Sequence, residues 1–322
     1  MANKKESVGK KKLDNNLLSI DLGYSGVKYY YKYQDKEYFG KVLNAVKETK
    51  KAEDGLLYEN KKYLIGDSAV DFDAELSLEV DSLIKYAPLF IHYILESENI
   101  DSEGLNLVTG LSIKDFNMSN DLTKKIQSFK INNIERSFEH VLILPQGRGL
   151  AYDYFDGKEI PDIVLVFDIG YNTFDFIVLQ DGKTNPDFSF ANNYGINKLI
   201  NNFQDRLYEE YNIERSSAEL IKILRTKQLK DHGEIIDCNE LIDECLNSYL
   251  AEIKNWCLKK KSSASLLART DILLFGGGGA YYLKLASNET IKKVFGRNML
   301  VFVDEPFEFS NARGYYKREV QK

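Results

Sequence analysis

The sequence predicts a mixed α/β protein built from two halves, and two observations lead to this expectation. The chain has 322 residues, which is long enough for two domains that each bury a core. Two apolar, strand-like runs are each followed by an Asp-aliphatic-Gly-Tyr sequence and a second strand-like run, at residues 17–28 and 163–178. This repeat indicates two halves that each contribute one strand–turn–strand unit.

The composition is that of a globular protein, with 43% hydrophobic and 29% charged residues and a net charge of −6. A negative net charge argues against strong direct binding to nucleic acids. No apolar run approaches the roughly 18 residues that span a bilayer, and the N-terminus lacks the apolar core of a signal peptide. The three cysteines fit no zinc-binding spacing, and an odd number suits a reducing compartment. We therefore expect a cytoplasmic protein that does not associate with membranes.

The first part of the chain begins with a lysine-rich stretch. Residues 1–16 carry five lysines and few apolar residues, which predicts a disordered basic extension. Two strands follow within residues 17–33, and alternation of polar and apolar residues along the second predicts one solvent-facing side. Glycine-punctuated short strands over about residues 34–80 are typical of a small β-rich insertion.

Alternating helices and buried strands complete the first half. Helical periodicity covers residues 81–98 and 119–129, and residues 105–111 form an apolar, strand-like run. A further buried strand, residues 141–144, runs into Pro145-Gln146-Gly147-Arg148-Gly149. A proline and two glycines at this point predict a tight exit into a helix, and we expect the chain to cross between the halves here.

The second half adds three predicted helices, at residues 195–211, 216–230 and 239–260. Ser216 and Glu219 have the spacing of a capping box at the start of the second helix. Cys245 and Cys257 lie on the apolar stripe of the third helix, so we expect them to be small core residues. The remaining predicted elements are the strands at residues 272–275 and 299–303 and a closing helix from residue 311.

The two Asp-aliphatic-Gly turns suggest chemistry with phosphate. Backbone N–H groups of a glycine turn can face phosphate oxygens, while the carboxylate at the end of the strand faces a magnesium ion. One such turn is common in any α/β protein. Here two occur in matched contexts, and a strand–Pro-Gln-Gly turn and a strand followed by four glycines accompany them in order. The combination indicates two halves that clamp one nucleotide.

The ordered set of segments resembles the actin-like ATPase superfamily, in which five segments surround the nucleotide. Phosphate-1, connect-1, phosphate-2, adenosine and connect-2 correspond to residues 17–28, 141–152, 163–178, 272–283 and 306–316. The resemblance implies a duplicated, ribonuclease H-like, two-lobed fold with a nucleotide cleft between the lobes. Lobe I would comprise residues 17–149 completed by 307–322. Lobe II would comprise residues 150–306, with a helical insertion at about 196–265.

Within this superfamily, two stretches look most like plasmid-segregation actins of the ParM/StbA type. They are Pro145-Gln146-Gly147-x-Gly149 and Asn311-Ala312-Arg313-Gly314. The resemblance implies binding and hydrolysis of ATP with Mg²⁺, filament formation, and a DNA-binding adaptor protein that links the filament to plasmid DNA. GTP stays open as the nucleotide, since backbone-lined purine pockets discriminate weakly.

The resemblance also implies roles for single residues. Asp21 and Asp168 would be catalytic residues that hold the water shell of Mg²⁺, Gln146 would position the attacking water, and Lys28 would neutralise phosphate charge. The residues that would face the phosphates are Gly23, Tyr24, Ser25, Gly26, Gly170, Tyr171, Asn172 and Thr173. The residues that would let adenosine lie against the backbone are Gly276, Gly277, Gly278 and Gly279.

Other interpretations of these residues remain open. Either aspartate can cap a turn, Lys28 can be an exposed strand lysine, and Gln146 can satisfy a loop carbonyl. A small-molecule kinase of the same fold is the alternative function, with Asp175 or Glu139 as the base that faces an acceptor hydroxyl. A nucleotide-dependent switch that does not polymerise is a third function, although no sequence remains for a substrate domain.

Overall fold

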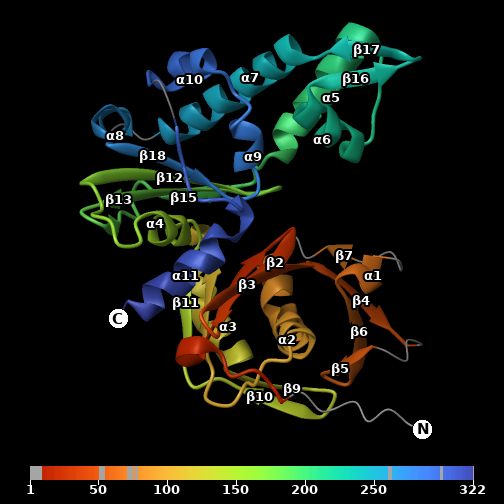
Figure 1. The fold of residues 1–322 in the computed structure, drawn as a ribbon, viewed down its shortest axis with the longest axis vertical. Coiled ribbons are helices and arrows are strands. Elements are labelled where there is room, and N and C mark those ends of the chain that lie inside the picture. Colours follow the sequence, from red (N-terminus) through yellow and green to blue (C-terminus); the bar gives the residue numbers. More distant parts are fainter. Residues whose placement is uncertain are drawn as a thin grey trace. The chain divides into compact units, whose positions relative to one another are not determined.

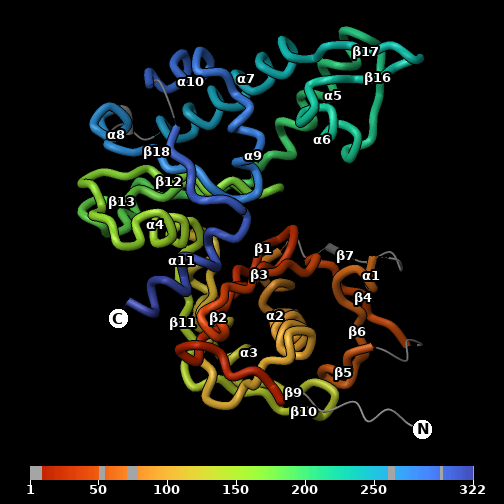
Figure 2. Tube along the Cα trace, in the orientation of Figure 1, coloured from red at the N-terminus to blue at the C-terminus, as the bar shows by residue number. Residues whose placement is uncertain are grey.

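A computed structural model describes residues 9–50, 55–70, 75–76, 79–259, 263–297 and 300–321 (Figure 1). The chain divides into two compact units. Unit 1 contains the residues up to 111, residues 115–145 and residues 311–322; unit 2 contains residues 112–114 and 146–310. The crossings at 145/146 and 310/311 lie four residues from the expected positions, 149/150 and 306/307. Figure 2 follows the same path as a tube.

Unit 1 is organised around a five-stranded sheet in the order β11-β8-β1-β2-β3. β1 pairs antiparallel with β2 and parallel with β8, and β8 pairs parallel with β11. The strands are β1 (Leu17–Gly23), β2 (Gly26–Tyr33), β3 (Lys36–Leu43), β8 (Asn106–Leu111) and β11 (Val141–Pro145). The helices of this unit are α1 (Asp67–Val70), α2 (Val80–Ser97), α3 (Ser119–Gln127) and α11 (Ser310–Val320), with the 3-10 helix η1 (Asp14–Asn16).

The side of β2 that was expected to face solvent is largely covered, with Lys28 and Lys32 only partly exposed, which corrects that expectation. On one face, Leu18 and Ile20 share a core with Phe90 of α2. On the other face, Tyr30 is only 1% exposed and its ring meets Tyr316 of α11 edge-on, with centroids 5.2 Å apart. Helix α11 comes from the far end of the sequence, so the local alternation of residues could not reveal this cover.

The β-rich insertion forms a separate four-stranded sheet in the order β5-β6-β4-β7. Its strands are β4 (Ala45–Thr49), β5 (Leu56–Tyr58), β6 (Lys61–Ile65) and β7 (Glu75–Leu76). β3 pairs with β2 instead, so the first strand of the expected insertion belongs to the main sheet. A hairpin of β9 (Ser128–Ile131) and β10 (Ile134–Ser137) holds the insertion, because Asn132 exchanges two hydrogen bonds with the backbone of Leu57, at 2.7 and 3.0 Å.

The described part of the N-terminal stretch is not a disordered extension. The N–H of Lys11 donates to the carbonyl of Asn99 at 2.8 Å, and the N–H of Asp101 donates to the carbonyl of Lys11 at 2.9 Å. Leu13 is 4% exposed and supplies an apolar anchor that a count of lysines does not reveal. Residues 1–8 of the predicted extension lie outside the described residues.

Unit 2 repeats the arrangement of strands seen in unit 1. β12 (Ile163–Ile169) pairs antiparallel with β13 (Phe174–Gln180) and parallel with β18 (Ile272–Gly276). The sheet runs in the order β14-β13-β12-β18-β19, and β15 pairs with β13. The shorter strands are β14 (Lys183–Thr184), β15 (Phe190–Asn192) and β19 (Val301–Phe302). An antiparallel hairpin with a parallel neighbour is therefore common to both units, in line with the repeat in the sequence.

Helices cover the unit 2 sheet and extend beyond it (Figure 1). They are α4 (Arg148–Tyr154), α5 (Asn197–Tyr211), α6 (Ser217–Thr226), α7 (Asn239–Cys257), α8 (Ser263–Arg269), α9 (Ala280–Leu283) and α10 (Asn288–Phe295). Two 3-10 segments are η2 (Ile113–Met118) and η3 (Phe307–Phe309). None of the helices in the described residues combines the length and the apolar character that a membrane span needs.

The predicted helix at residues 216–230 is too long. The capping box of Ser216 and Glu219 is confirmed, but α6 stops where Lys227 takes a left-handed φ of 58°. A hairpin of β16 (Gln228–Asp231) and β17 (Glu234–Asp237) follows, and both of its turn residues, His232 and Gly233, have positive φ. The apolar spacing in this hairpin continued the helical pattern, which hid the turn.

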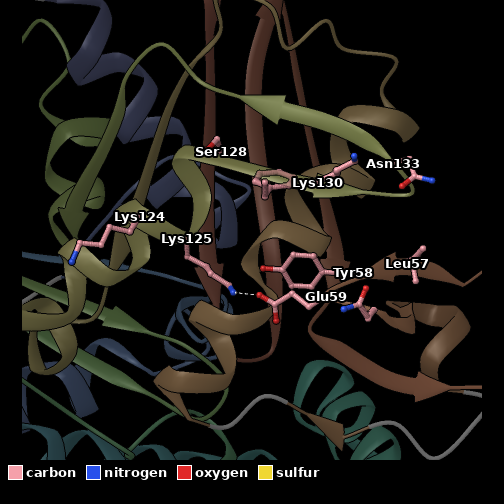
Figure 3. A pocket seen from close by; sticks show the side chains of 10 residues that line it. Leu57, Tyr58, Glu59, Lys124, Lys125, Ser128, Lys130 and Asn133 are labelled. Atoms are coloured by element: carbon pink, nitrogen blue, oxygen red, sulfur yellow. Dashed lines mark hydrogen bonds and ion pairs between the residues drawn. The ribbon is translucent and has the colours of Figure 1, made fainter.

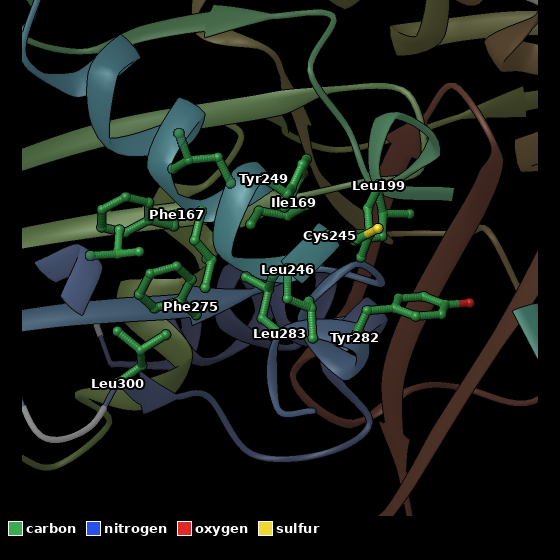
Figure 4. Packing of buried hydrophobic residues seen from close by; sticks show 14 of the residues in the cluster. Phe167, Ile169, Leu199, Cys245, Leu246, Tyr249, Phe275, Tyr282, Leu283 and Leu300 are labelled. Atoms are coloured by element: carbon green, nitrogen blue, oxygen red, sulfur yellow. The ribbon is translucent and has the colours of Figure 1, made fainter. Parts of the chain in front are cut away.

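The core of unit 2 is rich in aromatic side chains (Figure 4). The ring of Phe167 on β12 stacks on that of Phe275 on β18, with centroids 4.3 Å apart. Cys245 and Cys257 are buried in this core as predicted, and Cys238 joins them. Burial raises the pKa of the Cys245 thiol to about 11, so this group stays protonated and apolar at neutral pH.

Candidate functional site

The first candidate turn joins β1 to β2 in unit 1. Gly23 pairs with Gly26, so Tyr24 and Ser25 form the tip of the hairpin. Asp21 lies directly opposite Lys28, and the Lys28 Nζ atom is 3.4 Å from Asp21 Oδ2. The side chain of Lys28 is only 13% exposed and that of Asp21 only 6%, so Lys28 is not an exposed strand lysine. A buried ion pair therefore stands at the base of this turn.

Gly23 is packed closely in this turn, because a Cβ atom there would be 2.9 Å from the backbone carbonyl oxygen of Gly26. A Cβ atom on Gly23 would be 2.6 Å from Lys28 Nζ. The carbonyl of Gly23 accepts a hydrogen bond from Asn44 Nδ2 at 3.1 Å. The Tyr24 hydroxyl donates to Asp115 Oδ2 at 3.0 Å, so this unit holds the tyrosine ring through its tip. The turn is therefore fixed from several sides.

The second candidate turn joins β12 to β13 in unit 2. Its closing hydrogen bond runs from the N–H of Gly170 to the carbonyl of Thr173, at 2.8 Å. The carbonyls of Gly170 and Tyr171 accept from the N–H groups of Ile196 and Asn197, each at 3.0 Å. The backbone at the start of α5 thus donates hydrogen bonds to the carbonyl groups of this turn. The side chain of Asn172 accepts from Asn197 Nδ2 at 3.1 Å.

Two buried carboxylates stand at the base of the second turn. Asp168 and Asp175 are directly opposite one another across β12 and β13, and they are 8% and 3% exposed. Opposite residues of antiparallel strands project to the same face, where two like charges repel. The Ser112 hydroxyl donates to Asp175 Oδ1 at 2.6 Å. A divalent cation beside the pair would relieve the repulsion.

The donor set suits Mg²⁺ better than a metal held entirely by the protein. No group of three or more His, Cys, Asp or Glu side chains with metal-binding geometry occurs among the described residues. Mg²⁺ is commonly held by one or two carboxylates, while water and substrate phosphates supply the other ligands. Asp168, buried at the end of a strand and next to a glycine turn, fits this pattern.

Two further predicted segments meet at Asp168. A Cβ on Gly147 would be 3.5 Å from the Cβ of Asp168, so the Pro145-Gln146-Gly147 turn lies against this aspartate. A Cβ on Gly277 would overlap Asp168 Oδ1 and the carbonyl of Ile169. Gln146 is 9% exposed. Asp168, the Gln146-Gly147 turn and the glycine run are therefore brought together within unit 2, although they are far apart in the sequence.

The four glycines of the run do not serve one purpose. A Cβ on Gly276 would lie 2.5 Å from Leu150 Cδ2, and a Cβ on Gly279 would overlap Ile169. Both are therefore glycine because the protein packs against itself there, as Gly277 does against Asp168. Only at Gly278 is the Cβ position open, with Glu308 Cβ at 3.8 Å as its nearest described neighbour. Gly278 is the member of the run whose backbone a ligand could approach.

Sequence reasoning missed Ser112 and Gly195. Ser112 directly follows the end of β8, and the carboxyl ends of parallel strands are where functional groups gather, so its position was the available signal. Gly195 lies so close to the backbone of Tyr171 that any side chain would overlap it, and no local pattern indicates this contact. Glu139, one of the two carboxylates considered as a kinase base, is exposed just before β11 in unit 1.

A family profile described as "Archaeal actin homologue MreB-like, C-terminal" matches residues 166–287. No curated protein matches the chain in sequence. Among solved structures, an archaeal actin homologue superposes with a TM-score of 0.74 at 17% identity, covering 95% of this chain and 98% of its own. The fold is actin-like.

Two ParM structures are similar to this actin-like chain as well. A ParM of a 15-stranded filament from Clostridium botulinum has a TM-score of 0.65 at 18% identity, covering 98% of this chain and 100% of its own. Bacillus thuringiensis ParM with AMPPNP has a TM-score of 0.64 at 13% identity, covering 95% and 100%. The profile match and the shared fold agree with the actin-like fold that the sequence motifs indicated.

A pocket of about 430 Å³ in unit 1 of this actin-like protein contains none of the predicted site residues (Figure 3). It lies between β5, α3 and the β9–β10 hairpin, and Lys124, Lys125 and Lys130 line it. Lys125 Nζ forms an ion pair with Glu59 Oε1 at 2.5 Å, so part of its positive charge is neutralised. The candidate turns and this pocket are separate features.

Proposed function

We propose that this protein is a filament-forming ATPase that binds and hydrolyses ATP with Mg²⁺. One observation carries the proposal: Asp168, a buried strand-end aspartate beside a glycine turn, is contacted by both the Gln146-Gly147 turn and Gly277. In the proposed site, the glycine turn beside Asp168 would face the phosphates and Gln146 would position the attacking water. The glycine run that contains Gly277 would lie next to the adenosine. The archaeal actin homologue has also been solved in complex with ADP, which supports a nucleotide as the ligand.

In this proposal, each unit contributes one phosphate-facing turn. In unit 2, Tyr171, Asn172 and Thr173 offer backbone N–H groups and a hydroxyl to the phosphates. The N–H of Gly170 closes the turn, and α5 occupies its carbonyl side. In unit 1, the corresponding donors are the residues of the β1–β2 turn, namely Gly23, Tyr24, Ser25 and Gly26. Lys28 is held beside Asp21 and supplies a compact positive charge for phosphate oxygens.

Hydrolysis requires a positioned water and a stabilised leaving phosphate. Gln146 orients the attacking water, since its side-chain amide both donates and accepts hydrogen bonds. Bound Mg²⁺ would spread the negative charge that develops on the transferring phosphoryl group. Asp21 and Asp168, both buried, would hold water molecules around the ion. Loss of the γ-phosphate then weakens the contacts that favour assembly.

We propose further that the filaments segregate plasmid DNA through a DNA-binding adaptor protein. The net charge of −6 makes direct, strong binding of DNA by this chain unfavourable. We infer a cytoplasmic location from the three buried, free cysteines, which suit a reducing compartment. An electrophoretic mobility assay in about 150 mM salt should show no shift of DNA by the protein alone; a shift at low micromolar protein would contradict an adaptor-dependent link.

Light scattering with parallel phosphate release tests the assembly and the hydrolysis together. At tens of micromolar protein, scattering should rise after addition of ATP and Mg²⁺ and fall as phosphate accumulates. Electron microscopy of the same samples should show filaments, and replacing ATP by GTP establishes which purine is preferred. A protein that stays monomeric with either nucleotide would overturn the assembly role.

The alternative of a small-molecule kinase receives less support. Asp175, the better placed of the two possible bases, is 3% exposed and already accepts a hydrogen bond from Ser112. A general base must lie within reach of the acceptor hydroxyl, and a buried, engaged carboxylate is poorly suited to this. ATP turnover that rises only with a particular sugar or small acid, without scattering, would favour the kinase.

A further inference from the structure

An exposed apolar side chain lies near the turn of the β16–β17 hairpin. Ile235, the second residue of β17, is 68% exposed and is the most exposed of the large apolar residues in the described part of the chain. A single exposed apolar residue is common on protein surfaces and is not by itself a binding site. Its position on a projecting hairpin nevertheless makes it accessible to another molecule (Figure 1).

An aromatic pocket lies elsewhere on unit 2. It has a volume of about 280 Å³, and Phe188, Phe190 and Trp256 provide most of its apolar lining. Asn192 also lines it, and the side-chain nitrogen of this residue is buried without a hydrogen-bond partner among the described residues. The lining of the pocket is mainly apolar.

The hairpin and the pocket lie at opposite ends of helix α7. The helix begins at Asn239, two residues after the end of β17, and it ends at Cys257, which lines the pocket. Nineteen helical residues span about 28 Å at 1.5 Å per residue. Two different surfaces at opposite ends of a rigid element can join copies head to tail, and such contacts form open filaments when the rotation does not close a ring.

One pair of exposed charges beside the two features is complementary, although the exposed Lys230 lies directly opposite Ile235 on β16. Glu234 is exposed next to Ile235 on the hairpin. Lys259, also exposed, lies at the pocket and over the ring of Trp256. Opposite charges at the rim of an apolar contact favour the correct orientation of the partners and speed their association.

We propose that the β16–β17 hairpin of one copy inserts Ile235 into the aromatic pocket of the next copy and so forms a head-to-tail contact. This inference rests on the proposed filament function and names one interface of that assembly. The pocket and the side chain would act as the buried centre of a larger contact surface. The contact requires no residue of the candidate nucleotide site.

Trp256 is the only tryptophan of the chain, so its fluorescence reports on the pocket. With ATP and Mg²⁺, the emission maximum of the wild type should move to shorter wavelength as scattering rises. Ile235→Asp should raise the protein concentration needed for assembly at least tenfold and remove the wavelength shift. Tyr208→Asp is the matched control, since Tyr208 is 52% exposed on α5 of the same unit and should assemble as the wild type does.

A mixture of two variants tests the pairing itself. Phe188→Glu places a negative charge in the pocket, so neither it nor Ile235→Asp should polymerise alone. Mixed together, the intact hairpin of Phe188→Glu can enter the intact pocket of Ile235→Asp, and sedimentation equilibrium should reveal a heterodimer. Unchanged melting temperatures of both variants show that they are folded.

The possible failures are distinguishable. Ile235→Asp filaments that form at the wild-type concentration would overturn the interface and leave the filament function intact. Loss of assembly by both variants without a heterodimer in the mixture would also overturn the pairing. If the wild type itself fails to assemble, the proposed function fails, and the interface fails with it.

Discussion

Gly277 fits against the carboxylate of Asp168 so closely that a Cβ atom on the glycine would overlap Oδ1 of the aspartate. Gly277 also has a φ of 77°, in the region that residues with side chains rarely adopt. It directly follows Gly276, which pairs with Asp168 in the β12–β18 ladder. The conformation of the glycine run and the position of the aspartate therefore depend on each other.

Gly277→Ala should displace Asp168 and weaken both folding and nucleotide binding. The positive φ alone costs about 1 kcal/mol for alanine, and the overlap with Oδ1 and the Ile169 carbonyl adds to this. Gly157→Ala is the control, because Gly157 has a φ of 68° but no described atom within 4 Å of its Cβ position. Urea unfolding should give a larger loss for Gly277→Ala; equal losses would mean that the overlap relaxes without cost.

Asp168→Ala should abolish Mg²⁺-dependent hydrolysis while the protein stays folded. Removing the carboxylate takes away the group proposed to hold the ion's water shell and leaves Asp175 as the one carboxylate of this opposed pair. Phosphate release and the melting temperature are the measurements. Asp162→Ala, at an exposed position before β12, should retain wild-type turnover. Turnover that survives in Asp168→Ala would show that the paired turns do not form the catalytic site.

Lys28→Met should reduce nucleotide affinity roughly tenfold or more, since a charge-assisted contact is worth about 1.5–3 kcal/mol. The methionine keeps most of the apolar stem, so the packing over Gly23 changes little. Fluorescent-nucleotide titration measures the effect. Lys32→Met, four residues further on the same strand, removes a more exposed lysine and should bind as the wild type does. Equal affinity in both variants would exclude Lys28 from phosphate binding.

Tyr316→Ala should destabilise unit 1 by about 3–5 kcal/mol, the usual cost of removing a buried aromatic ring. The ring is 2% exposed and packs on Tyr30, and its hydroxyl accepts from Asn15 at 3.1 Å. Val320→Ala, at a 47% exposed position of the same helix, should change stability by no more than about 0.5 kcal/mol. Denaturant unfolding compares the two variants, and similar midpoints would show that α11 contributes little to the unit.

Glu98 should make the free energy of unfolding depend on pH in the acidic range. Burial alone would raise its pKa, but hydrogen bonds from the Tyr29 and Tyr31 hydroxyls and the nearby Lys11 outweigh burial and lower the pKa below 4.5. A carboxylate whose pKa is lowered by folding stabilises the protein above the unfolded pKa, and this stabilisation is lost as pH falls through the folded pKa. Glu98→Gln should therefore be less stable than wild type at pH 7, with the difference shrinking below about pH 4. A constant difference between pH 3 and 7 would contradict this.

The residues around Asp168 show what a sequence can and cannot predict. A buried strand, an aspartate and a glycine turn are neighbours in the chain, so local pattern was sufficient to find them. The approach of Gly277 and Gly147 to the same aspartate followed from the order of motifs in a known superfamily. The contact of Ser112 with Asp175 depends on side-chain packing between distant strands, which no pattern in a single sequence records.

The fold errors have the same origin. The local pattern places Tyr30 on a solvent-facing side of its strand. The residue that covers it, Tyr316, lies 286 residues later in the sequence. The β16–β17 hairpin continues the apolar spacing of α6, and only the positive φ angles at Lys227, His232 and Gly233 separate the two. Local propensity decides the type of a well-formed element, but tertiary contacts decide where it ends and which side is buried.

Helix α11 has a consequence for the order in which the chain can fold during synthesis. Residues 311–322 belong to unit 1, and the Ser19 hydroxyl on β1 donates to the carbonyl of Ala312 at 2.5 Å. The central strand of unit 1, β1, is therefore synthesised before residues 146–310. Helix α11, which covers this strand, is synthesised after them. Unit 2 can reach its native packing on the ribosome, while one face of the unit 1 sheet stays uncovered until helix α11 has been synthesised. A nascent chain that stops at residue 310 would expose Tyr30 and is a natural target for chaperones.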